Sequence, residues 1–106
     1  MSKSINPKSK EPIVVNRLAI ILKEERRSNK WLAGEIGFTE TTVSKWATNA
    51  KQPNIFIFYL IALVLKRDLK DLFVSTLEID DTERVKQIKA LLEIAKQGKR
   101  TGKEKR

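Results

Sequence analysis

The chain has 106 residues, of which 41% are hydrophobic, and its formal net charge is +9. This length supports one small domain with a modest core, and the apolar fraction argues against global disorder. The absence of cysteine and histidine excludes disulfides, thiolate or imidazole metal ligands and His-based catalytic triads, so we expect no enzyme, no catalytic residues, no metal and no cofactor.

Residues 1–12 are expected to form a flexible basic N-terminal arm. Residues 1–11 carry three lysines and one glutamate, a net +2, and they contain no apolar segment of signal-peptide length. The longest apolar run, residues 55–65, is shorter than the roughly 20 residues that span a bilayer. We therefore expect a cytoplasmic protein that does not associate with a membrane.

After Pro12 the apolar residues recur every three to four positions, as in short amphipathic helices. Asn16 is predicted to cap a first helix that runs into the charged segment at 23–27. Ser28 is predicted to cap a second helix over residues 29–36. Gly37 ends that helix, because glycine adopts a positive φ without a Cβ clash.

Thr39 is predicted to cap a third helix, residues 40–48, whose buried face carries Val43 and Trp46. Asn49 follows this helix and tolerates the left-handed conformation that ends it. We expect Trp46 to fill the core, because it occupies an inward position.

Pro53 and Asn54 introduce a fourth helix, residues 55–65, which is apolar nearly all round. Such a helix is usually the most buried element of a small bundle. Asp68 is predicted to cap a short fifth turn over residues 69–73.

Asp81 or Thr82 is predicted to open a last helix, which ends near Gln97 and carries a second apolar stripe. We place the domain boundary after residue 76, so that residues 13–76 form the bundle and residues 77–97 the C-terminal helix. Residues 96–106 carry a net +5, and residues 98–106 are expected to be a disordered basic tail. The sequence shows no strand-type alternation, so the predicted fold class is all-α.

Residues 29–48 satisfy the spacing of a helix-turn-helix motif, in which two short helices cross at a steep angle. The fifth position must be small and is Ala33, and the ninth requires positive φ and is Gly37. The positions that should face inward are all apolar: Leu32, Ile36, Phe38, Val43 and Trp46.

Here the sequence resembles the Xre family of Cro/repressor-type regulators, over about residues 16–74. The carriers of the resemblance are Leu32-Ala33, Gly37, the box Val43-Ser44-Lys45-Trp46, Pro53 and the helix at 55–65. The resemblance implies a five-helix lambda-repressor-like DNA-binding bundle, here with an additional C-terminal helix. It also implies transcriptional regulation, with the helix at 40–48 in the major groove.

Two positions depart from the family pattern. The family often has Glu and then Gly after the box, where this chain has Ala47 and Asn49. It also favours Gln at the start of the first motif helix, where this chain has the shorter Asn29, which weakens one expected phosphate contact.

Four residues near the start of the reading helix and one turn on are expected to contact bases: Glu40, Thr41, Ser44 and Lys45. Lys45 can donate to guanine O6 and N7, and Thr41 can offer its methyl group to thymine. Glu40 either accepts from cytosine N4 or only favours the positive end of the helix dipole, and we favour the second reading.

Residues at a helix N-terminus and in the loop after the reading helix are expected to contact the DNA backbone: Asn29, Lys30, Thr48, Asn49, Lys51 and Gln52. The alternative is that they form an ordinary solvated face. Trp31 either braces the first helix or touches the sugar-phosphate backbone, and packing is the favoured reading.

Two functions remain open at this point. The first is a sequence-specific regulator that binds double-stranded DNA as a homodimer, paired through the stripe at 77–95. The second is an antitoxin-like module that holds a toxin-like partner protein through the same helix; the stripe could also fold back on the core. An enzymatic role is disfavoured, because Asp80 and Asp81 are better explained as helix caps.

Overall fold

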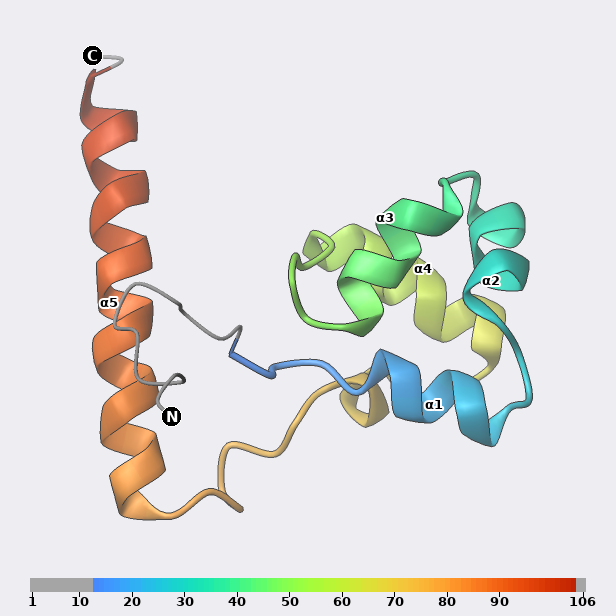
Figure 1. The fold of residues 1–106 in the computed structure, drawn as a ribbon, viewed down its shortest axis with the longest axis horizontal. Coiled ribbons are helices and arrows are strands. Elements are labelled where there is room, and N and C mark those ends of the chain that lie inside the picture. The colour runs from blue at the N-terminus through green and yellow to red at the C-terminus, as the bar shows by residue number, and fades with distance from the viewer. Residues whose placement is uncertain (1–12, 105–106) are drawn as a thin grey trace, which may run out of the picture. The chain divides into compact units, whose positions relative to one another are not determined.

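The structure, a computed structural model, describes the backbone of residues 13–104 and the side chains of residues 13–97. The described residues form five α-helices and one short 3-10 turn (Figure 1): α1 (Leu18–Glu24), α2 (Asn29–Ile36), α3 (Glu40–Ala47), α4 (Ile55–Leu65), η2 (Leu69–Leu72) and α5 (Asp81–Glu104). Within this part of the chain there is no strand, only an isolated antiparallel bridge between Asn16 and Phe73. The all-α prediction is confirmed.

The chain divides after Val74 into two compact units. The first unit holds α1 to α4 and η2 around one core, and the second holds α5. The expected arm at 1–12 and the last two residues lie outside the described residues. No helix in the described part of the chain is long and apolar enough to cross a membrane.

The core of the first unit is built from the inward faces of all its helices. Its members are buried to 6% exposure or less: Leu18, Ile21, Leu22, Leu32, Ala33, Val43, Trp46, Phe58, Ile61, Ala62, Leu65 and Leu72. The inward positions predicted from the motif at Leu32, Ala33, Val43 and Trp46 are therefore confirmed. Ile36 is partly buried against this core. Phe38 does not face inward as predicted: it is 38% exposed, and its ring meets that of Trp46 in a T-shaped contact with 5.0 Å between centroids.

Helix α1 starts one residue later than predicted and, as predicted, runs into the charged segment at 23–27. Its N-cap is Arg17, which makes no side-chain cap bond, while Oδ1 of Asn16 accepts from the Leu18 N–H at 2.9 Å. The helix ends at Glu24, inside that segment. Arg26 turns left-handed with φ 58°, and the Arg27 N–H closes the helix end on the Leu22 carbonyl.

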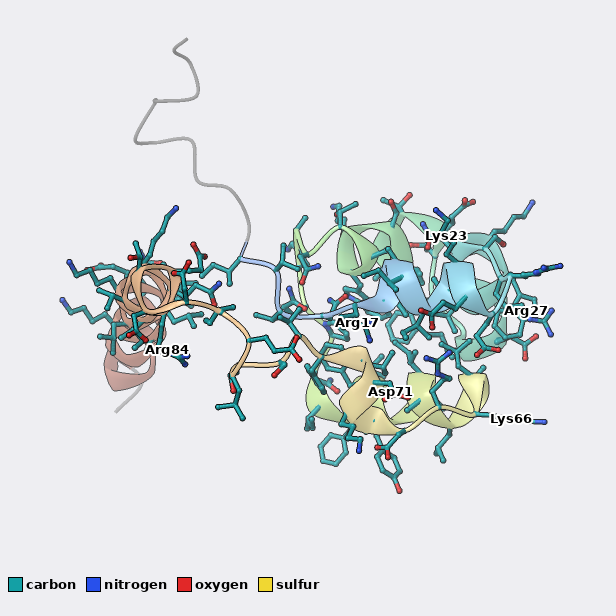
Figure 2. The ribbon with its side chains drawn as sticks, turned by 90° about the horizontal axis from the view of Figure 1, so that it is seen from below. Arg17, Lys23, Arg27, Lys66, Asp71 and Arg84 are labelled. Carbon is teal, nitrogen blue, oxygen red and sulfur yellow. The ribbon has the colours of Figure 1, made fainter. Side chains whose placement is uncertain are left out.

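Helix α4 corrects a second expectation, since it is not buried all round. Phe58, Ile61, Ala62 and Leu65 face the core, but Ile55, Phe56, Tyr59 and Leu63 are each more than half exposed. Figure 2 shows α4 and η2 along one side of the bundle and α2 and α3 along the other. A bundle this small buries only the inner face of such an outer helix.

Helix α5 begins where Oδ1 of Asp80 accepts from the Glu83 N–H at 2.8 Å, so this carboxylate caps the helix as expected. The helix then runs to Glu104, past the expected end near Gln97. Residues 98–104 thus continue the helix instead of forming the disordered tail. No proline interrupts the segment, and its Lys, Arg and Glu residues are good helix formers, whereas Gly98 and Gly102 disfavour the helix.

The turn between α2 and α3 should be sensitive to one substitution. Gly37 has φ 80° and open space around it, so Gly37→Ala meets no clash but must adopt the left-handed conformation. We expect a loss of about 1–2 kcal/mol in the free energy of unfolding, measured in urea. Gly34→Ala is the matched control, because Gly34 lies in α2 with open space. Gly34→Ala should raise the free energy of unfolding by about 0.5–1 kcal/mol. Equal effects at both glycines would show that the left-handed conformation of Gly37 does not matter for stability.

Candidate nucleic-acid interface

The two central helices are joined by the short turn at residues 37–39. The hydroxyl of Ser28 accepts from the Trp31 N–H and caps α2. At the other end of α2, the Ala33 carbonyl accepts from the N–H groups of Gly37 and Phe38 at 2.9 and 3.0 Å. Both expected caps of α2 are thereby confirmed, and the turn is fixed by backbone hydrogen bonds.

Thr39 starts α3. Its Oγ1 accepts from the Thr42 N–H at 3.1 Å and lies 2.9 Å from the Thr42 hydroxyl. The predicted cap is confirmed, and the helix ends at Ala47, within one residue of the expected end. Because the Thr42 hydroxyl pairs with the cap, this side chain is held near the first turn.

The outer face of α3 carries the four residues predicted to contact bases. Glu40, Thr41 and Lys45 are exposed and Ser44 is half-buried, whereas Val43 and Trp46 point into the core. Positions three and four apart lie on one side of a helix, so Thr41, Ser44 and Lys45 share a face. The structure therefore gathers these side chains on one polar surface.

The residues predicted to contact the DNA backbone fall into two groups. Lys30, Thr48 and Lys51 are exposed and Asn29 is half-buried, so these side chains are accessible. Thr48 Oγ1 donates to the Lys45 carbonyl at 3.2 Å, so this hydroxyl can still accept a hydrogen bond.

Asn49 is only 7% exposed, and its side chain is engaged inside the protein with residues 15, 16 and 52. It cannot serve as the phosphate contact expected of it. Gln52 is exposed, but its side-chain amide is already engaged: its Oε1 accepts from Asn16 and its Nε2 donates to Asn49. The left-handed backbone predicted for Asn49 is confirmed, at φ 63°.

Trp31 is half-buried and packs against the core. The guanidinium of Arg27 lies over its ring, 4.3 Å from the centroid, and Figure 2 shows Arg27 on the outside of the bundle. This cation–π contact holds one positive charge beside the start of α2. The packing interpretation of Trp31 is therefore confirmed.

An ion cluster around Arg67 was not predicted from the sequence. Its guanidinium donates to Glu25 at 2.7 Å and to Glu24 at 3.0 Å, and it lies 3.5 Å from Asp71. The hydrogen bonds to Glu25 and Glu24 raise the pKa of Arg67 above its ordinary value. Three carboxylates are thus gathered on one cation. Residues 24 and 67 are 43 positions apart, which no local pattern reveals.

The chain is similar to a solved structure. It is described as the "Crystal structure of a putative DNA-binding protein from Bacteroides fragilis". The match has a TM-score of 0.57 and 34% sequence identity, and it covers 58% of this chain and 100% of that chain. No protein-family profile and no curated protein matches the chain.

The cap at Thr39 sets where the exposed face of α3 begins. Thr39→Ala removes the oxygen that accepts from Thr42, and we expect a loss of about 1 kcal/mol in the free energy of unfolding. Thr39→Ser is the control, because it keeps the cap oxygen. Thermal and urea unfolding of both variants check this. Equal stability of Thr39→Ala and the parent chain would show that the cap does not hold the helix.

Proposed function

Since the chain belongs to the same family as the Bacteroides fragilis protein, we propose that it binds double-stranded DNA with α3 in the major groove. The observation that carries the proposal is the division of α3 into two faces. Val43 and Trp46 are buried on one face, and a polar surface with an outward lysine forms the other. A short helix that projects a polar face from a rigid bundle is the docking element of helix-turn-helix proteins.

In this proposal Lys45, Thr41 and Ser44 contact base edges. Lys45 donates to guanine O6 and N7, and Thr41 contacts a thymine methyl group or donates through its hydroxyl. Glu40 lies in the first turn of α3, where a carboxylate favours the positive end of the helix dipole. Acceptance from cytosine N4 is its alternative role.

Contacts to the DNA backbone fall to the accessible side chains at the rim of this face: Asn29, Lys30, Thr48 and Lys51. Arg27 adds a positive charge beside them, fixed by its stacking on Trp31. These groups set orientation and overall affinity, while the face of α3 sets sequence preference.

The resemblance to the Xre family supports a role as a transcriptional regulator. The Val43-Ser44-Lys45-Trp46 box lies on α3 and Gly37 lies in the turn before it, as that family's motif requires. Selection from a random duplex library followed by sequencing tests the proposal. An enriched palindromic motif supports a dimeric regulator, and the absence of any enriched motif contradicts sequence-specific binding.

Helix α5 carries an exposed apolar stripe that favours a protein partner. Val85, Ile88, Leu91 and Leu92 are between 44% and 58% exposed. We propose that this stripe pairs two copies, which would place two reading helices on half-sites about one helical turn apart. The second candidate is that the stripe holds a different, toxin-like protein, since the resemblance also allows antitoxins of this fold.

Lys45→Ala should separate base reading from general affinity. We expect a loss of about 1–3 kcal/mol on the selected duplex and a relaxed preference at one base position. Lys51→Ala is the control. Loss of a phosphate contact should weaken binding about equally on all duplexes and lower its salt dependence. Equal weakening on every sequence by Lys45→Ala would reassign Lys45 to the backbone.

Leu92→Glu places a charge in the stripe of α5 and should convert a dimer to a monomer in light scattering. Ala90→Glu is the matched control, since it adds the same charge on the opposite face of the helix. If both variants remain dimers, pairing does not use this stripe, and the exposed face of α4 is the next surface to alter. If the parent chain is a monomer, the stripe serves a different partner.

A further inference from the structure

The C-terminal end of α3 is held by a side chain from the start of the chain. Asn16 is 2% exposed, and its Nδ2 donates to the Trp46 carbonyl at 2.9 Å and to Oε1 of Gln52 at 2.7 Å. The last carbonyls of a helix have no partner within the helix. The Trp46 carbonyl accepts here from two donors: the Asn49 N–H at 3.0 Å, which closes the turn after α3, and the Asn16 amide from 30 positions earlier.

Asn49 completes this network from the other side. Its Oδ1 accepts from the backbone N–H groups of Val15 and Asn16, both at 2.9 Å, and from Nε2 of Gln52 at 3.0 Å. Its Nδ2 donates to the Asn16 carbonyl at 3.1 Å. The Asn16 amide thus bonds to the end of α3, and the Asn49 amide bonds to the backbone of Val15 and Asn16. A buried network whose polar groups are all satisfied specifies one geometry.

The same network reaches the residue proposed to read bases. The Lys45 carbonyl accepts from the N–H groups of Ala50 and Lys51 at 2.9 and 3.2 Å, and from the Thr48 hydroxyl. The loop at 48–52 is therefore tied to the backbone of Lys45 on one side and to Asn16 on the other. The proposed phosphate contacts of this loop and the proposed base contacts of α3 are held in one fixed relation.

We infer that Asn16, Asn49 and Gln52 are positioning residues for DNA recognition: they fix the loop that contacts phosphates relative to the helix that reads bases. This inference rests on the proposed function. It differs from a purely structural role in one consequence. Loss of the network should reduce the preference for the selected duplex, whereas a plain loss of stability leaves that preference unchanged once the protein is folded.

Asn49→Gly is the sharpest variant, because glycine accepts the left-handed backbone of residue 49 and removes only the amide. We expect affinity for the selected duplex to fall about tenfold while affinity for random duplex stays within about twofold. Gln52→Met removes two hydrogen bonds at the exposed edge of the network and leaves the core intact. It should show a smaller change in the same direction, even if Asn49→Gly does not fold.

Arg67→Met is the control for stability alone, since it breaks the ion cluster with Glu24 and Glu25 and contacts nothing in the network. It should leave the ratio of the two affinities unchanged. If Asn49→Gly and Gln52→Met also leave the ratio unchanged, the network is structural only and the inference is overturned.

Amide hydrogen exchange of the free protein separates this inference from the proposed function. In Asn49→Gly, the amides of Val15, Asn16 and residues 50–51 should exchange faster while those of α2 keep their protection. If the parent chain binds no duplex, the proposed function fails and so does the recognition role. If exchange at these amides is unchanged in Asn49→Gly, the network does not hold the loop in place, and the inference is refuted whether or not the chain binds DNA.

Discussion

The crossing of α2 and α3 through the turn at residues 37–39 is the constraint on which the other features depend. Ala33 is small and buried at the crossing, and its carbonyl accepts from two N–H groups of the turn. Gly37 supplies the left-handed residue that reverses the chain. With this crossing fixed, Val43 and Trp46 must point into the core, so the polar residues of α3 are left on the outside.

Much of this architecture could be predicted, because its determinants are local. The caps at Ser28, Thr39 and Asn54 each bond a backbone N–H three residues on, so a short window of sequence contains the whole interaction. The boundaries of α2 and α4 and the inward positions of α3 follow from such windows. The polar face of α3, with Thr41, Ser44 and Lys45, follows from the same register.

What could not be predicted depends on partners far away in the chain. Asn49 looks like a surface loop residue, but it is buried by Val15 and Asn16, which lie more than 30 positions earlier. Arg67 looks like a free cation, but it pairs with Glu24, the last residue of α1, and with the C-cap residue Glu25. One face of α4 is exposed because the bundle has too few other helices to cover it. The apolar pattern of a helix does not show how many neighbours the helix has.

Methylation interference on a selected duplex tests the central claim most directly, because dimethyl sulfate modifies guanine at N7 in the major groove and adenine at N3 in the minor groove. If α3 reads the major groove through Lys45, methylation of guanine N7 within the motif should abolish binding, and methylation of adenine N3 should be tolerated there. Interference from adenine N3 alone, with guanine N7 tolerated, would contradict a reading helix in the major groove.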